Sequence, residues 1–330
     1  MSLLPLTFAC APYDRTLPLY DGRVKVEGVN LNVILLRYED TFWRMLRHQE
    51  FDVSEMSLSS YLISKEKGPE FVALPVFLSR VFRHSSIYIN RESGIAQASD
   101  LKGKRVGVPE YQITAALWIR GILEHEYGVP PAAMTWLSGG LDEPGRIEKL
   151  DLNLPSNVSL TLIPEDQTLN GQLLSGEIDA IVTARAPSSF NENHPNVARL
   201  FEDYKTEEIN YYKKTKIYPP MHCVAIRREV YEDNRWIAQS LFKAFNKARE
   251  FCDIDFMFDG HLRYALPFLH AAVEEHHAIF GTDDPWCYGI EENRHTLETL
   301  VSYSHEQGLI PRNYDLAELF AEETWATSRN

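Results

Sequence analysis

Two arginines and a histidine lie within a few positions of one another in an otherwise apolar stretch, PVFLSRVFRHSSIYIN, at residues 75–90. A buried guanidinium group costs free energy unless an anion pairs with it, and its planar fork matches a carboxylate. We therefore predict that Arg80 and Arg83 bind an anionic ligand, with Ser85 on the same face as Arg83, and that His84 transfers a proton. Residues three apart in an extended segment point to opposite faces, so the alternative that only one of the two arginines enters the cleft stays open. A structural salt bridge is the alternative for each arginine.

The stretch PEYQIT (109–114) ends one predicted strand and opens a predicted helix. Free backbone N–H groups and the dipole at a helix N-terminus favour an anion. We predict that Tyr111 and Thr114 contact the ligand there and that Glu110 donates or accepts a proton. The alternative is a simple helix cap, in which the Glu110 carboxylate complements the dipole.

The elements that would position these side chains alternate along the chain. Short strand-like runs and helix-like runs follow one another, the pattern restarts in a second, smaller unit, and the C-terminal part is helical. We predict an α/β protein of two lobes, each a mixed sheet flanked by helices, with a helical C-terminal extension. Lobe 1 comprises residues 1–92 plus 223–330, lobe 2 comprises residues 93–222, and the ligand cleft lies between them.

His222, in YPPMHCV, lies where the chain is expected to return between the lobes, and His84 lies on the outgoing connection. Two histidines on two crossing strands would be close in space. We predict that at least one of them transfers protons together with Glu110. A structural role is the alternative for each histidine.

Polar side chains also occur at the ends of predicted strands, at the edge where open α/β sheets bind ligands. Tyr13 follows the first strand, and Glu55 and Ser57 follow a later strand of the same lobe. Arg185 follows the strand IDAIVTA in the second lobe, where it would bind another carboxylate. We predict that these four residues contact the ligand; the alternative is that they tie down the strand ends.

Composition excludes several classes of partner. The 330 residues include 33 Lys+Arg and 47 Asp+Glu, a formal charge of −14, which argues against nucleic acid or an anionic membrane. No apolar run reaches about 18 residues, so we expect no membrane span. Four dispersed cysteines without a C-x-x-C pair predict neither a disulfide framework nor a zinc site. Together with N-terminal residues that lack a basic leader, they favour the cytoplasm.

Two further motifs are assigned no ligand. Neighbouring residues such as His276 and His277 point about 100° apart on a helix, which disfavours joint chelation, so no metal site is predicted. The glycine-rich SGGLDEPGR (138–146) fits neither the P-loop nor the dinucleotide motif, and we expect a loop at the cleft mouth. The oligomeric state stays open, including a homo-oligomer.

Several motifs carry a family resemblance. FDVSEMSLSSYL, DLKGKRVGVPE and LLSGEIDAIV resemble the framework of type II periplasmic-binding-protein folds, the two-lobed clamshells. PVFLSRVFRHSSIYIN, GVPEYQITAALWIRGILEHEYGV, DPWCYGIEENRHTLETL and EQGLIPR together resemble the 4,5-dihydroxyphthalate decarboxylases. The resemblance covers nearly the whole chain. It implies loss of CO₂ from an aromatic diacid without a cofactor, giving protocatechuate.

Such a reaction sets clear demands. Direct loss of CO₂ would leave an aryl anion whose lone pair lies in the ring plane, where the π system cannot delocalise it. Protonation of the carboxyl-bearing carbon before CO₂ leaves is easier, and a phenolate para to that carbon supplies electron density. The protein must therefore bind carboxylates, assist loss of the hydroxyl proton and present an acid to the ring.

Two other functions remain open on the same fold. One is a clamshell that binds an aromatic or dicarboxylic acid without changing it. The other is a pyrimidine-synthesising enzyme of the thiamine pathway, which the absence of a Lys-centred motif disfavours. The sequence leaves open the ring substituents, the residue that protonates the ring and the help of a divalent ion.

Overall fold

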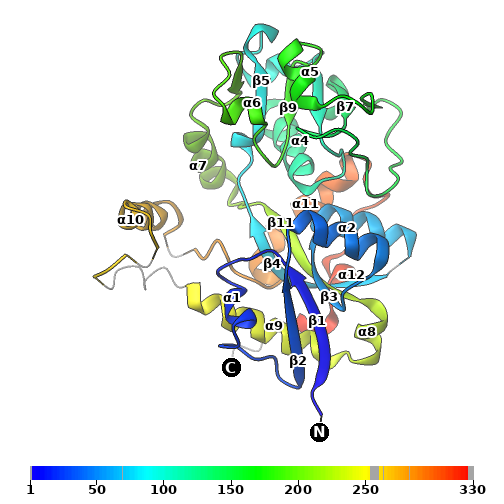
Figure 1. Ribbon diagram of the computed structural model, residues 1–330, viewed down its shortest axis with the longest axis vertical. Coiled ribbons are helices and arrows are strands. Elements are labelled where there is room, and N and C mark those ends of the chain that lie inside the picture. The colour runs from blue at the N-terminus through cyan, green and yellow to red at the C-terminus, as the bar shows by residue number, and fades with distance from the viewer. Residues whose placement is uncertain (1, 69, 253–259, 263, 282, 326–330) are drawn as a thin grey trace.

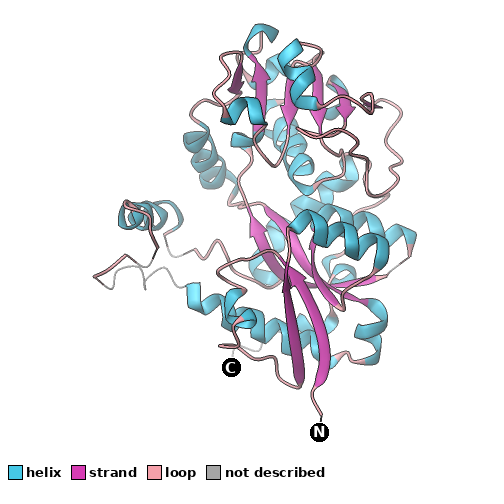
Figure 2. Ribbon diagram, in the orientation of Figure 1, coloured by secondary structure: helices cyan, strands magenta, loops and turns pink. Residues whose placement is uncertain are grey.

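The computed structural model describes residues 2–68, 70–252, 260–262, 264–281 and 283–325. Its strands form one five-stranded and one six-stranded sheet. Figure 1 shows the two sheets in opposite halves of an elongated molecule, and Figure 2 shows helices flanking both. No helix among these residues is both long and apolar enough to span a bilayer.

The first sheet has the strand order β2-β1-β3-β11-β4. Its strands are β1 (Leu4–Cys10), β2 (Val29–Leu35), β3 (Val53–Ser57), β4 (Phe71–Arg80) and β11 (Pro220–Arg227). β1 is parallel to β2 and β3, whereas β11 is antiparallel to β3 and β4. β3 is buried along its whole length and β4 nearly so. β4 accordingly reads as an almost continuous apolar run, whereas β3 buries the polar side chains of Ser54 and Glu55.

The second sheet has the strand order β10-β5-β9-β6-β7-β8. Its strands are β5 (Ile87–Asn90), β6 (Arg105–Val108), β7 (Thr135–Ser138), β8 (Ser159–Leu162), β9 (Ala180–Val182) and β10 (Val197–Arg199). β6 is parallel to β7 and β9, whereas β5 is antiparallel to β9 and β10. Both sheets are therefore mixed, as predicted.

Helices cover both sheets. They are α1 (Leu17–Tyr20), α2 (Tyr38–His48), α3 (Leu58–Ser64), α4 (Thr114–Tyr127), α5 (Leu169–Ser175), α6 (Ser188–Asn191), α7 (Tyr204–Thr215), α8 (Arg228–Asp233), α9 (Trp236–Arg249), α10 (Leu269–Phe280), α11 (Arg294–Glu306) and α12 (Leu316–Leu319). α4 is buried over most of its length and packs against α11. Gly121 of α4 makes this approach feasible, because a Cβ there would lie 2.0 Å from the Tyr303 ring of α11.

The chain crosses twice between the sheets, first between Arg80 and Ile87 and again between β10 and β11. Figure 1 shows β4 and β11 side by side where they leave the lower half of the molecule. The lobe division at residue 92 stays a prediction; the membership of β5 in the second sheet favours an earlier boundary.

The stretch 75–90 is not one continuous strand. β4 ends at Arg80, His84–Ser86 form a 3₁₀ turn, and β5 begins at Ile87. The expectation that Arg83 and Ser85 share a face of one strand is therefore wrong, because the chain leaves one sheet and turns into the other between Arg80 and Ile87.

Candidate active site

A cavity of about 320 Å³ lies between the two halves and is lined by residues of both. This volume is in the range of small-molecule sites, roughly 300–1,000 Å³. Six of the predicted ligand-site residues line it: Tyr13, Ser57, Arg83, Thr114, Arg185 and His222. They come from the ends of β1, β3, β4 and β9, from the first turn of α4 and from β11.

An imidazole–carboxylate pair stands on one wall of the cavity. Nδ1 of His222 lies 2.6 Å from Oε1 of Glu55, whose side chain is fully buried. Glu55 also accepts hydrogen bonds from the Tyr13 hydroxyl at 2.5 Å and from the Ala11 amide at 2.9 Å. The pair forms because β3 and β11 are adjacent antiparallel strands, in which Val224 is opposite Glu55 and His222 is opposite Ser57.

The environment of Glu55 determines the state of the pair. Burial would raise the pKa of Glu55, but the His222 imidazole and the hydrogen bonds from Tyr13 and Ala11 lower it below the usual carboxyl range. Burial raises the pKa of Tyr13, so its hydroxyl keeps the proton that it donates. An ionised carboxylate can only accept, so Nδ1 of His222 carries a proton and Nε2 is available to a ligand.

Arg83 is the cavity arginine of the predicted pair. Burial lowers the pKa of Arg83 to about 10, so the guanidinium stays charged at neutral pH. Its Nε donates to Sδ of Met221 at 3.2 Å, and within the described part of the chain it forms no ion pair. Arg80 instead donates to the carbonyl oxygens of Tyr218 and Cys287, both at 3.0 Å, and does not line the cavity.

Glu110 lies behind the cavity wall rather than in it. Its side chain is 1% exposed and accepts from Lys149, with Nζ 2.5 Å from Oε2, and from Arg146, with Nε 2.7 Å from Oε1. Both cations line the cavity. Because the Glu110 carboxylate is held by these two cations and does not line the cavity, its geometry suits positioning of Arg146 and Lys149 better than proton exchange with a ligand.

The two cations belong to residues 139–158, which connect β7 to β8 without a helix or strand. The chain turns tightly at Gly140, where a Cβ would lie 1.6 Å from the carbonyl oxygen of Glu143. The predicted glycine-rich loop therefore does border the cavity, through Leu141 and Arg146. We name residues 139–158 the cavity loop.

Three other predicted residues lie outside the cavity. His84 packs among Tyr127, Phe201 and Tyr211, and burial lowers the pKa of His84 to about 4. The amide of Ser85 donates to Glu208, and the ring of Tyr111 stacks on the Arg120 guanidinium at 3.6 Å. The turn at residues 84–86 directs His84 into an aromatic cluster instead of the cleft.

The other lining residues were not named individually from the sequence, although Pro109, Ile113, Leu141 and Arg146 belong to segments predicted at the cleft. They are Ala11, Tyr38, Glu39, Phe42, Ser79, Val81, Pro109, Ile113, Ala115, Leu141, Arg146, Lys149, Thr183, Ala184 and Met221. Tyr38 and Phe42 had a readable signal, because they are four residues apart on one helix face directly after a parallel strand. Their rings lie 5.4 and 4.8 Å from that of His222 and give the cavity an aromatic wall.

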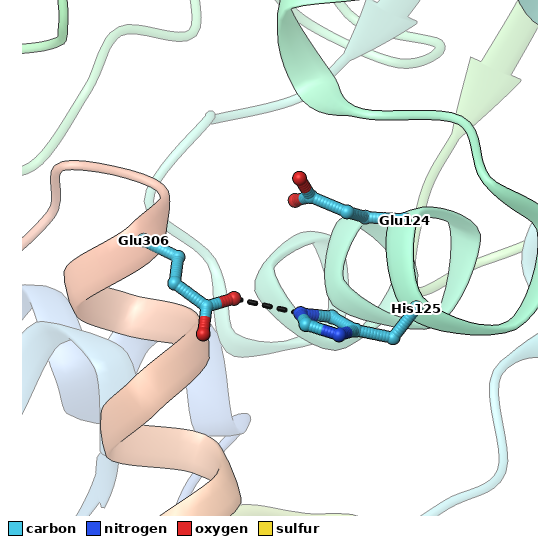
Figure 3. Close-up of side chains that lie close together, drawn as sticks. All are labelled: Glu124, His125 and Glu306. Atoms are coloured by element: carbon cyan, nitrogen blue, oxygen red, sulfur yellow. Dashed lines mark hydrogen bonds and ion pairs between the residues drawn. The ribbon is translucent and has the colours of Figure 1, made fainter.

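A potential metal-binding trio lies elsewhere, on α4 and α11. The ligand atoms of Glu124, His125 and Glu306 lie within 4.8 Å of one another in the described residues (Figure 3). His125 pairs with Glu306 at 2.7 Å, and its ring stacks on Tyr303. All three side chains are at least partly exposed, and the trio does not line the cavity.

Comparison with known proteins finds two relatives that carry the same name. No family model matches the chain. A 4,5-dihydroxyphthalate decarboxylase of Comamonas testosteroni is 40% identical over 97% of this chain and 97% of its own length. One of Pseudomonas putida is 45% identical over 64% of this chain and 83% of its own length.

Solved structures show the fold. The periplasmic aliphatic sulphonate binding protein SsuA of Escherichia coli matches 98% of this chain and 99% of its own, with a TM-score of 0.53 at 13% identity. A putative periplasmic sulfonate-binding protein of Methylobacillus flagellatus covers 96% of this chain and 91% of its own, with a TM-score of 0.52 at 13% identity. The predicted two-lobed, type II binding-protein-like α/β fold is thereby confirmed.

Proposed function

The chain belongs to the 4,5-dihydroxyphthalate decarboxylase family, and we propose that it removes CO₂ from 4,5-dihydroxyphthalate in the cavity between its two sheets, giving protocatechuate. One observation carries the site assignment: His222, paired with Glu55 behind it, and the Arg83 guanidinium line the same cavity. An acid and a carboxylate-binding group are what the reaction requires.

Arg83 binds one carboxylate of the substrate in this proposal. It is the cavity cation that forms no ion pair within the described residues, and it is buried, so its charge is poorly screened by water. A guanidinium–carboxylate pair also fixes the orientation of the ring, because two parallel hydrogen bonds define a plane.

His222 delivers the proton to the ring. With Nδ1–H held by Glu55, the imidazolium can donate from Nε2 to the ring carbon that carries a carboxylate. Glu55 stabilises the charged imidazole and fixes the ring orientation, and it does not itself touch the ligand. Glu110 keeps Arg146 and Lys149 in place and has no part in proton transfer.

In the proposed reaction, protonation of the ring precedes the loss of CO₂. The hydroxyl para to the reacting carbon loses its proton to solvent, favoured by the cationic lining, and the phenolate pushes electron density to that carbon. The carbon takes a proton from His222, giving a non-aromatic intermediate. The bond to the carboxylate breaks, its electron pair returns to the ring as CO₂ leaves, and the restored phenolate is reprotonated. One proton is consumed per CO₂ released.

Incubation of the purified protein with 4,5-dihydroxyphthalate tests the proposal. Chromatography with mass spectrometry should show protocatechuate and CO₂ in equal amounts. Phthalate, which lacks a hydroxyl, should bind without turnover, and 4-hydroxyphthalate should give 3-hydroxybenzoate, because only one of its carboxyl-bearing carbons is para to the hydroxyl. Binding of 4,5-dihydroxyphthalate without any chemical change would instead support the alternative of a clamshell binding protein.

The cytoplasmic location stays a prediction, which cell fractionation tests.

A further inference from the structure

Glu39 joins the two halves of the molecule across the cavity. It lies in the first turn of α2, beside the first sheet, and its carboxylate oxygen Oε1 lies 3.2 Å from Nη1 of Arg146 and 3.3 Å from Nη2 of Arg185. Arg146 belongs to the cavity loop, and Arg185 follows β9 of the second sheet. All three side chains line the cavity.

The cavity cations differ in the carboxylates that they already hold. Lys149 pairs with the buried Glu110, and Arg185 pairs with Glu39. Arg146 pairs with both of these carboxylates. Arg83 forms no ion pair within the described ranges. A ligand with one carboxylate can therefore be neutralised at Arg83 without displacing a protein group. The second carboxylate of a diacid needs cations that the protein already neutralises.

Glu39 is the protein carboxylate that can give way. The Glu39 side chain is 23% exposed, so it can reach water by rotating away from the arginines. The Glu110 side chain is 1% exposed, so loss of its cations would leave a buried carboxylate without a partner. Arg185 is 47% exposed and Arg146 is 26% exposed, so both remain accessible to an incoming anion.

We propose that Arg146 and Arg185 form a second carboxylate subsite, that Glu39 occupies it in the free protein, and that Glu39 thereby separates diacids from monoacids. The inference rests on the proposed function for the identity of the ligands. The substrate carries two carboxylates and the product one. Once CO₂ has left, Glu39 competes on better terms for the two arginines, and the product is released.

Calorimetric binding of two unreactive acids tests this subsite. Phthalate carries two carboxylates and benzoate one, and each is titrated into the wild-type protein, Glu39→Gln and Asp40→Asn. Asp40→Asn makes the same charge change one residue along α2, at an exposed side chain outside the cavity lining. Glu39→Gln should bind phthalate about tenfold more tightly, because the competing carboxylate is gone. Benzoate affinity should stay within about twofold in both variants, since salt screens a remote charge.

The opposite results are equally clear. Unchanged or weaker phthalate binding in Glu39→Gln, or tightening of both acids by the same factor, would overturn the inference. Arg185→Gln provides a second measurement: it should weaken phthalate binding and leave benzoate binding unaltered. Neither acid reacts, so the binding test is independent of the activity assay with 4,5-dihydroxyphthalate. A changed phthalate-to-benzoate ratio, combined with no CO₂ release from 4,5-dihydroxyphthalate, would refute only the proposed function. CO₂ release from 4,5-dihydroxyphthalate, combined with an unchanged phthalate-to-benzoate ratio, would refute only this inference.

Discussion

Replacement of Glu55 by glutamine isolates the contribution of the imidazole–carboxylate pair. The change removes the charge that faces Nδ1 of His222 at 2.6 Å and keeps the size of the side chain. Both partners are shielded from water, with side chains 0% exposed for Glu55 and 12% exposed for His222. Hydrogen bonds to charged groups contribute about 1.5–3 kcal/mol. At about 1.4 kcal/mol per factor of ten, kcat should fall about 10- to 150-fold.

Steady-state kinetics with 4,5-dihydroxyphthalate measure this effect. KM should change little, because Glu55 does not line the cavity. Glu207→Gln is the matched control, since Glu207 also accepts a tyrosine hydroxyl, that of Tyr127 at 3.0 Å, away from the cavity. Its kcat should remain at the wild-type value. Full kcat in a folded Glu55→Gln protein, with an unchanged circular dichroism spectrum, would refute the role of the pair.

Three further outcomes are expected. Arg83→Ala should weaken phthalate binding about 10- to 150-fold in calorimetry, from the loss of a charge-assisted contact; equal affinity would remove Arg83 from the site. Glu110→Gln leaves Lys149, which is 8% exposed, without its carboxylate, and it should lower the free energy of unfolding by about 3–5 kcal/mol in urea titrations. An unaltered urea midpoint would show that the Glu110–Arg146–Lys149 cluster is not needed for stability. Burial raises the pKa of Glu148 from 4.5 to about 7, so the folded state holds its proton while the unfolded state releases it, and the free energy of unfolding should fall as pH rises through this window. Glu148→Gln should remove this part of the pH dependence, and an identical profile in the variant would assign the dependence to other groups.

The sequence located the parts of the site that depend on strand order. His222 could be placed at the cavity because it lies on a strand that crosses between the halves, and Tyr13 and Arg185 because they follow strands. Glu55 was predicted as a ligand contact and lies instead behind His222, because adjacent antiparallel strands bring the two side chains together. The pairing of β3 with β11 cannot be deduced from the sequences of the two strands taken separately.

The remaining parts depend on local geometry without a periodic pattern. Arg146 and Lys149 reach the cavity from a loop that has no helix or strand, so no spacing pointed to them or to their contact with Glu110. His84 has the same residue type and strand context as His222, but one turn of 3₁₀ helix places it in an aromatic cluster. A backbone turn of three residues therefore decided which histidine meets the cavity.

The most direct test of the central claim is a crystal structure of the wild-type protein with phthalate bound. The account predicts phthalate in the cavity between the two sheets, with one carboxylate about 3 Å from the Arg83 guanidinium and a carboxyl-bearing ring carbon facing Nε2 of His222. Phthalate bound elsewhere, or held in the cavity with its ring turned away from both side chains, would contradict the account.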